Sequence, residues 1–164
     1  MADRLKAKLL DILKEEKKLY EKLFQAAEGK KEALIENDID KLMEKVEVDQ
    51  KVIPEIEKKE AKRNEVIEEI KAEFNLETAE NSYKALFKEL PADWSEDFAP
   101  VREELLELTD EFNKLNQNNQ KLLEQALKLN QISFNTILDN LEDKTTYADP
   151  AKKASQPRII NKKG

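Results

Sequence analysis

Residues 101–141 read VREELLELTDEFNKLNQNNQKLLEQALKLNQISFNTILDNL, and this stretch decides the fold. Its apolar residues recur in alternating steps of three and four, which places them on one face of a helix. The stretch contains neither Pro nor Gly, so we predict a single uninterrupted helix. Four positions in its first half, Leu105, Leu108, Phe112 and Leu115, are expected to pack against the preceding helices.

The middle and the end of this helix differ from an ordinary amphipathic pattern. The middle is rich in amides, and Asn119 occupies a position in the apolar stripe, where an amide limits which partners and registers fit. The last third is apolar on more than one side, through residues such as Leu127, Phe134 and Ile137. A helix end with a widened apolar face needs something to cover it.

Composition limits the protein class. The chain has 164 residues, of which 39% are hydrophobic, 40% are charged and only 2 are Gly, and this profile favours a helical bundle or coiled coil. The net charge of −7 argues against a duplex nucleic acid as partner. No apolar run reaches membrane-spanning length and no signal sequence is recognisable, so we expect a cytoplasmic protein.

The residues for common catalytic or metal sites are missing. The chain has no Cys and no His, which excludes thiol chemistry, disulfides and a di-iron site built on Glu-x-x-His. It also lacks a Gly-rich phosphate loop. Its many paired acids are typical of solvated helix faces, where they pair with Lys one turn away. We predict a protein that is not an enzyme and has no cofactor and no metal ion.

Two helices are predicted before the deciding stretch. The first, about residues 2–36, has two adjacent apolar stripes, as suits a helix that contacts two neighbours. Asn37 and Asp38 are good N-caps for the second, about residues 39–74, which we expect to be bent at Pro54 but continuous. Three polar residues interrupt its stripe. They could form a buried network. The favoured interpretation is that they lie at the solvent-exposed edge of the stripe, because a buried charge without a partner lowers stability. These residues are Asp49, Glu60 and Arg63.

A short third helix is predicted for about residues 79–90, and Pro91 ends it. A turn follows, and its Trp94 is expected to cap the end of the bundle with a partly buried indole. The long helix should begin between Ser95 and Pro100, because Pro is best tolerated in the first turn.

The predicted fold is therefore all-α. Residues 1–141 form an elongated antiparallel bundle of three long helices plus one short helix, and residues 142–164 form a flexible, basic tail with no acidic residue from Pro150 onward. The tail is either a solvated end or a segment that docks on a partner. At about 1.5 Å per residue the last helix is the longest, so part of it should lack cover from the other two.

Particular residues of the long helix and tail resemble the FlgN-type flagellar export chaperones. The similarity rests on Leu115-Asn116-x-x-Asn119-x-x-Leu122-Leu123, then Leu129-Asn130-Gln131, then Tyr147-x-Asp149. A looser similarity continues through the N-terminal half and covers most of the chain. One difference is that Pro150 follows Asp149, where the family usually has a Gly shortly after the Tyr.

The resemblance implies a type III export chaperone of the bacterial flagellum. Such a protein would bind hook-associated (hook–filament junction) proteins, prevent their premature assembly and deliver them to the export gate. An amphipathic client helix would lie along the long helix, in the helix-in-groove mode. The expected client-binding residues are Asn119, Leu122, Leu123, Leu127, Asn130, Phe134, Ile137, Leu138 and Leu141. Tyr147 and Asp149 in the tail would contact the client or the cytosolic domain of the export gate.

Two other interpretations remain open. The chain could be a structural coiled-coil protein, in which a second copy covers the long helix in a homodimer. It could also be a different adaptor that uses this helix to hold an unrelated protein.

Overall fold

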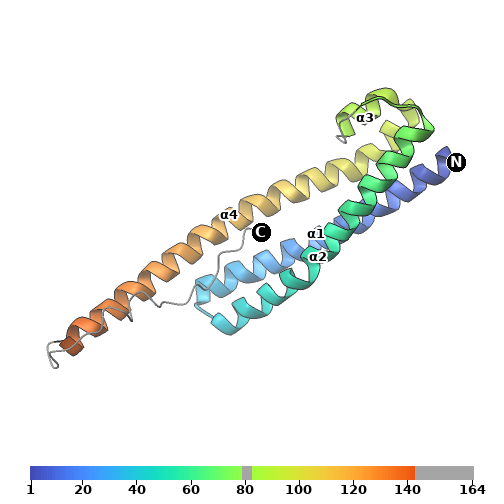
Figure 1. Cartoon of the computed structure of the whole chain (residues 1–164). Coiled ribbons are helices and arrows are strands. Elements are labelled where there is room, and N and C mark those ends of the chain that lie inside the picture. The colour runs from blue at the N-terminus through green and yellow to red at the C-terminus, as the bar shows by residue number, and fades with distance from the viewer. Residues whose placement is uncertain (79–82, 143–164) are drawn as a thin grey trace.

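The computed structural model describes residues 1–78 and 83–142, without the side chains of residues 132–134, 137 and 140–142. The described residues form four helices and no strand: α1 (Ala2–Glu36), α2 (Ile39–Glu73), α3 (Tyr83–Glu89) and α4 (Ala92–Glu142). The three long helices run up, down and up (Figure 1). The predicted bundle of three long helices and one short helix is confirmed. The predicted tail lies, from residue 143 on, outside the described residues.

The turn between α1 and α2 uses the two capping residues expected there. Asn37 takes a left-handed conformation with φ 56°, which ends α1. The backbone N–H of Asp38 then donates to Ala33 O over 2.9 Å, and the Asp38 side chain accepts from the Lys41 N–H over 3.0 Å. These bonds satisfy groups that both helix ends would otherwise leave unpaired.

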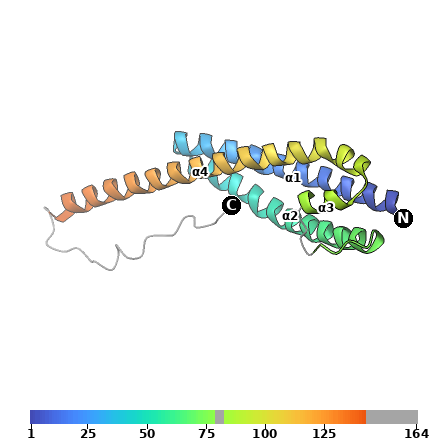
Figure 2. The same ribbon diagram turned by 90° about the horizontal axis from the view of Figure 1, so that it is seen from above.

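α1 is the central element of the bundle. It packs against both α2 and α4, whereas no described Cα of α2 lies within 8 Å of a described Cα of α4. Figures 1 and 2 show α4 running beside α1 in the same direction, with α2 antiparallel to both. The two apolar stripes predicted for this helix therefore face two neighbours, as expected.

α1 and α2 approach closely near their shared turn, and α2 is continuous. A Cβ added to Gly29 would lie 2.7 Å from Cε of Lys45, so the Lys45 side chain occupies the space above this residue. α2 runs through Pro54 as a single helix, as its unbroken apolar register predicted. Its first and last residues match the predicted bounds to within one residue.

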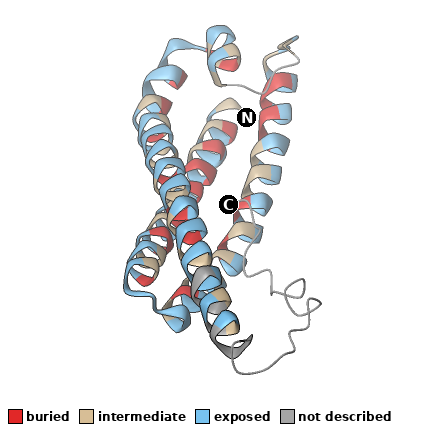
Figure 3. Ribbon diagram, turned by 90° about the vertical axis from the view of Figure 1, so that its left-hand side faces the viewer, coloured by how far each residue is buried: buried red, intermediate tan, exposed pale blue. Residues whose placement is uncertain are grey.

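Two clusters of buried side chains hold the helices together. The first joins all four helices around Leu9, Ile70, Leu86 and Phe98, none of which is more than 1% exposed. The second joins the three long helices around Leu23, Ile56 and Phe112. Figure 3 shows the buried residues on the faces that the helices turn toward one another.

The four expected core positions of the long helix differ in burial. Phe112 is buried in the second cluster, and Leu115 packs partly buried against it. Leu105 packs partly buried against the first cluster, and Leu108 is also half-buried. Only Phe112 thus has the full burial of a core residue, because α4 has one neighbour along most of its length.

The start of α4 differs from the prediction. The helix begins at Ala92 and not between Ser95 and Pro100, so Pro100 lies inside it. A Pro there removes one backbone hydrogen bond. Burial offsets this cost, because Trp94, Phe98 and Val101 are spaced on one helical face and are all buried in the first cluster. The short helix α3 matches its prediction from Tyr83 on, and residues 79–82 lie outside the described residues.

Trp94 is more deeply buried than predicted. It lies at the end of the bundle, as expected, but only 3% of it is exposed. Its ring meets the Phe74 ring edge-on at 5.4 Å and stacks on the Phe98 ring at 6.0 Å. Trp94 lies in the first turn of α4 and not in the predicted turn before it, so its indole packs into the first cluster.

A comparison of two leucines tests this description of the core. Leu9→Ala should lower the free energy of unfolding by about 3 kcal/mol, because Leu9 is fully buried in the first cluster. Leu106→Ala is the matched control, because Leu106 is 58% exposed on α4 and should change stability by less than about 0.5 kcal/mol. Urea unfolding followed by circular dichroism measures both, and equal losses would contradict the assignment.

Candidate functional site

α4 continues beyond the helices that it packs against. Asn119 contacts Ala27, and nine residues of α1 follow Ala27 whereas 23 residues of α4 follow Asn119. The last 14 of these, residues 129–142, are named here the α4 extension, which is about 21 Å long. Figures 1 and 2 show this end of α4 projecting past the α1–α2 turn.

Asn119 fixes the register of α4 against α1. Its Nδ2 donates to the Ala27 carbonyl oxygen over 2.8 Å, and the residue is 5% exposed. Because the buried Nδ2 donor finds its partner at this position, sliding the helices past each other would leave that donor unpaired. Leu123, one turn further on, is also buried, at 7% exposure. Both residues were expected to bind a client, but the structure places them in the interface with α1.

The other expected client-binding residues follow the helix outward. Leu122 and Leu127 are half-buried beside the bundle, and within the α4 extension Asn130 is exposed and Leu138 is half-buried. The side chains of Phe134, Ile137 and Leu141 lie outside the described residues, as do Tyr147 and Asp149 in the tail. The accessible described part of the predicted surface therefore consists of Leu122, beside the bundle, and the residues that follow Leu123.

One exposed residue was not on the expected list. Leu129 is 65% exposed and is the first residue of the α4 extension. It continues a seven-residue spacing through Leu108, Leu115 and Leu122, and residues with this spacing share one face of a helix. These four residues form the leucine stripe of α4. The spacing was visible in the sequence, and it would have identified Leu129.

A shallow groove lies between α1 and α4, near the leucine stripe. Its volume is about 490 Å³, and its apolar lining consists of Phe24, Ile35 and Leu115. Ile35 is 65% exposed, and across the α1–α2 turn Ile39 and Met43 are 63% and 45% exposed. Large exposed apolar residues therefore gather at the end of the bundle from which the α4 extension projects.

A buried charged pair on the other face of α1 was not predicted. Glu16 is 1% exposed, and the Arg63 guanidinium donates to its Oε2 over 2.7 Å. Burial raises the pKa of the Glu16 carboxyl, and the nearby Arg63 charge opposes that rise. Beside this pair the Tyr20 hydroxyl donates to Glu60 over 3.4 Å.

The favoured interpretation placed the polar residues of α2 at the solvent-exposed edge of its apolar stripe, and this was wrong for Arg63. Arg63 contacts the buried carboxylate of Glu16 on α1. Asp49 of α2 forms a mostly buried ion pair with Lys30, which also lies on α1. Lone polar residues inside the apolar stripe of α2 marked both contacts. The partners could not be identified from the sequence, because they depend on the register between α1 and α2.

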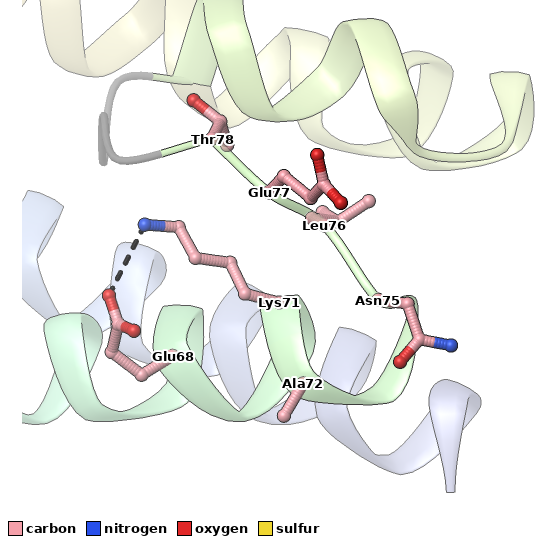
Figure 4. Close-up of a pocket in the computed structure, with 7 residues that line it drawn as sticks. All are labelled: Glu68, Lys71, Ala72, Asn75, Leu76, Glu77 and Thr78. Carbon is pink, nitrogen blue, oxygen red and sulfur yellow. Dashed lines mark hydrogen bonds and ion pairs between the residues drawn. The ribbon is translucent and has the colours of Figure 1, made fainter.

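A second hollow, of about 590 Å³, lies at the end of α2 (Figure 4). It is lined by residues from Glu68 to Thr78, and the Lys71 amine reaches across to Glu68 over 3.2 Å. Its walls come from one continuous stretch of chain. Such a hollow does not bring distant side chains together, so we do not assign a site to it.

Two other kinds of feature are absent from the described residues. Among residues 1–78 and 83–142, no group of His, Cys, Asp and Glu is arranged to hold a metal ion. None of the described helices is long and apolar enough to cross a membrane.

Comparison with known protein families shows to which family the chain belongs. Residues 1–155 match the family described as FlgN protein. The chain belongs to the FlgN family. This match confirms the family resemblance that the sequence of the long helix and tail indicated. The FlgN family implies a flagellar export chaperone in general terms. No curated protein and no solved structure matches the chain.

The match to the FlgN family covers all four helices and extends past Tyr147 and Asp149. It ends at residue 155, so the last nine residues of the chain lie beyond it.

The Glu16–Arg63 pair makes a specific pH prediction. Because the pKa of the Glu16 carboxyl is raised in the folded protein, this carboxyl stays protonated to higher pH in the folded state than in the unfolded state. The contribution of Glu16 to stability is therefore full below its unfolded pKa of about 4.3 and is lost as pH rises through the raised value. Glu16→Gln should become more stable relative to the unsubstituted chain as pH increases from 4 to 7, as measured by urea midpoints.

A second variant tests whether the two side chains are coupled. Arg63→Ala should cost about 3 kcal/mol, because it leaves a buried carboxylate without its partner. The same change should cost much less in the Glu16→Gln background. Equal costs in the two backgrounds would show that Arg63 and Glu16 are not coupled.

Proposed function

We propose that this chain is a cytoplasmic type III export chaperone that binds hook-associated flagellar proteins and delivers them to the export gate. Membership of the FlgN family supports a flagellar export chaperone in general terms. The observation that carries the proposal is the α4 extension, on which Leu129 is 65% exposed and which has no neighbouring helix among the described residues.

The proposed client segment is an amphipathic C-terminal helix of a hook-associated protein. It would lie along α4 past Leu122, with the leucine stripe, including Leu129, at one edge of the contact and with Leu127 and Leu138, about half a turn around the helix, at the other edge. Phe134, Ile137 and Leu141 would lie between these two edges. Burying one exposed leucine side chain contributes about 2 kcal/mol, so a few such contacts suffice for a stable complex. While the client helix is covered, it cannot pair with other subunits.

The amides would have two separate roles. Asn130 is exposed on the α4 extension and would select the register of the client helix. Asn119 and Leu123 would act indirectly, because they hold α4 against α1 and so determine where the extension begins. A direct contact between a client and these two residues would require α4 to leave α1.

Self-association is the second candidate function. A seven-residue leucine spacing also suits a coiled coil between two copies of the chain, and the same extension would then form a homodimer. Light scattering across a range of protein concentrations distinguishes the two. A chaperone of the proposed kind stays at the mass of a single chain until a client is added, whereas a homodimer doubles its mass with concentration.

Two leucine-to-glutamate changes test the client surface. Leu129→Glu should weaken binding of a C-terminal peptide from a hook-associated protein by roughly 30-fold, because it places a charge in the apolar contact. Leu106→Glu is the matched control, since Leu106 lies on the same helix and is 58% exposed, but beside the bundle. It should leave affinity unchanged. Isothermal titration measures both, and equal affinities would remove Leu129 from the surface.

A tail variant tests the proposed delivery step. Tyr147 and Asp149 would contact the client or the cytosolic domain of the export gate. Tyr147→Ala should leave the thermal unfolding temperature unchanged within error, because a residue of the predicted tail is expected to contribute little to the core. It should weaken binding to the gate domain or to the client-loaded complex at least tenfold. Unchanged binding to both would exclude this residue from delivery.

A further inference from the structure

The groove between α1 and α4 carries uncompensated acidic charge beside its apolar lining. Glu28, Glu32 and Glu111 line it together with Phe24, Ile35 and Leu115. Glu32 is paired with Lys41 over 2.9 Å, but Glu28 and Glu111 have no ion-pair partner among the described residues. The groove also contains Lys114, which is paired with Asp110, and Lys31, which has no ion-pair partner among the described residues, so its unpaired groups are two acids and one base. It therefore suits a segment that combines apolar side chains with positive charge.

The end of this chain has that composition. Five of its 29 basic residues and none of its 36 acidic residues follow Asp149, so residues 1–149 hold 24 basic and 36 acidic residues and have a net charge of −12. Ile159 and Ile160 are the only large aliphatic residues after Leu141, and they lie between Arg158 and Lys162. A basic segment with an apolar centre is thus tethered to an acidic body that has an apolar groove.

The length of the tail allows it to reach the groove. From Glu142 back to Leu115, α4 spans 27 residues, which is about 40 Å of helix. From Glu142 to Ile159 the chain has 17 residues, which can extend to about 56 Å. Because both partners belong to one chain, their effective concentration is high, on the order of millimolar for such tethers, and weak contacts suffice.

We propose that the C-terminal segment of residues 158–163 binds in the groove between α1 and α4 of the same chain. Ile159 and Ile160 contact Phe24, Ile35 and Leu115, and the flanking basic residues pair with Glu28 and Glu111. The bound segment covers apolar surface beside the leucine stripe. Residues 158–163 lie beyond the match to the FlgN family, which ends at residue 155.

A spin label on the tail tests the contact directly. The chain has no Cys, so Asn161→Cys provides a single attachment site for a nitroxide on the full-length protein. In the free protein, the label should remove more than half of the amide signal intensity of groove residues such as Lys31, Ile35 and Lys114. Signals at the opposite end of the bundle, such as those of Lys8, should keep their intensity. Equal intensities at the two ends would overturn the proposal.

Two sets of substitutions assign the contact to particular groups. Glu28→Lys with Glu111→Lys should restore most of the lost signal intensity, and so should Ile159→Ser with Ile160→Ser. Glu73→Lys with Glu96→Lys is the matched control, because both acids are exposed at the opposite end of the bundle and have no ion-pair partner among the described residues. It should leave the broadening unchanged. Broadening that survives the Glu28 and Glu111 changes would overturn the proposal.

A mixing experiment identifies the source of the segment. Isotope-labelled protein without the Cys is mixed with spin-labelled protein that carries no isotope. Contact within one chain predicts no broadening in this mixture, whereas broadening of the groove signals would show that a second copy supplies the segment and would overturn the proposal. No client is present in any of these samples, so the outcome is separate from the test of client binding.

Discussion

The hydrogen bond from Asn119 to the Ala27 carbonyl determines where the free part of α4 begins. α1 and α4 are long amphipathic helices, and apolar side chains alone permit several registers between them. A buried amide accepts only the register in which its donor is satisfied. Once Asn119 lies beside Ala27, the greater length of α4 must project past the α1–α2 turn. The bundle, the groove and the extension all depend on this register.

The position of α1 between α2 and α4 explains why a charged residue is buried in the core. Because α1 contacts α2 on one side and α4 on the other, ten of its residues are buried between its neighbours. Glu16 is buried in this way, and Arg63 of α2 compensates its charge while keeping part of its own side chain in solvent. A buried ion pair usually adds little net stability compared with apolar residues, but another register of α2 would leave the buried Glu16 carboxylate without this partner.

Much of this fold could be predicted from the sequence. The bounds of α1 and α2 followed from apolar periodicity and the Asn37–Asp38 caps, which are local signals. The start of α4 could not be predicted in this way, because the burial of Trp94 and Phe98 is a tertiary effect that outweighs the local preference of Pro100. For the candidate site, the sequence indicated an uncovered helix end. It did not show that Asn119 and Leu123 face α1, since their exposure depends on the register between two helices.

The isolation of the α4 extension has a consequence for how such proteins diverge. Its residues have no helical neighbour in the described structure, so their number is not tied to the length of α1 or α2. Inserting seven residues would move the end of the helix by about 10 Å and keep the leucine stripe on the same face. The reach of the protein can therefore change by whole heptads while the bundle stays the same, and its length becomes an independently variable trait.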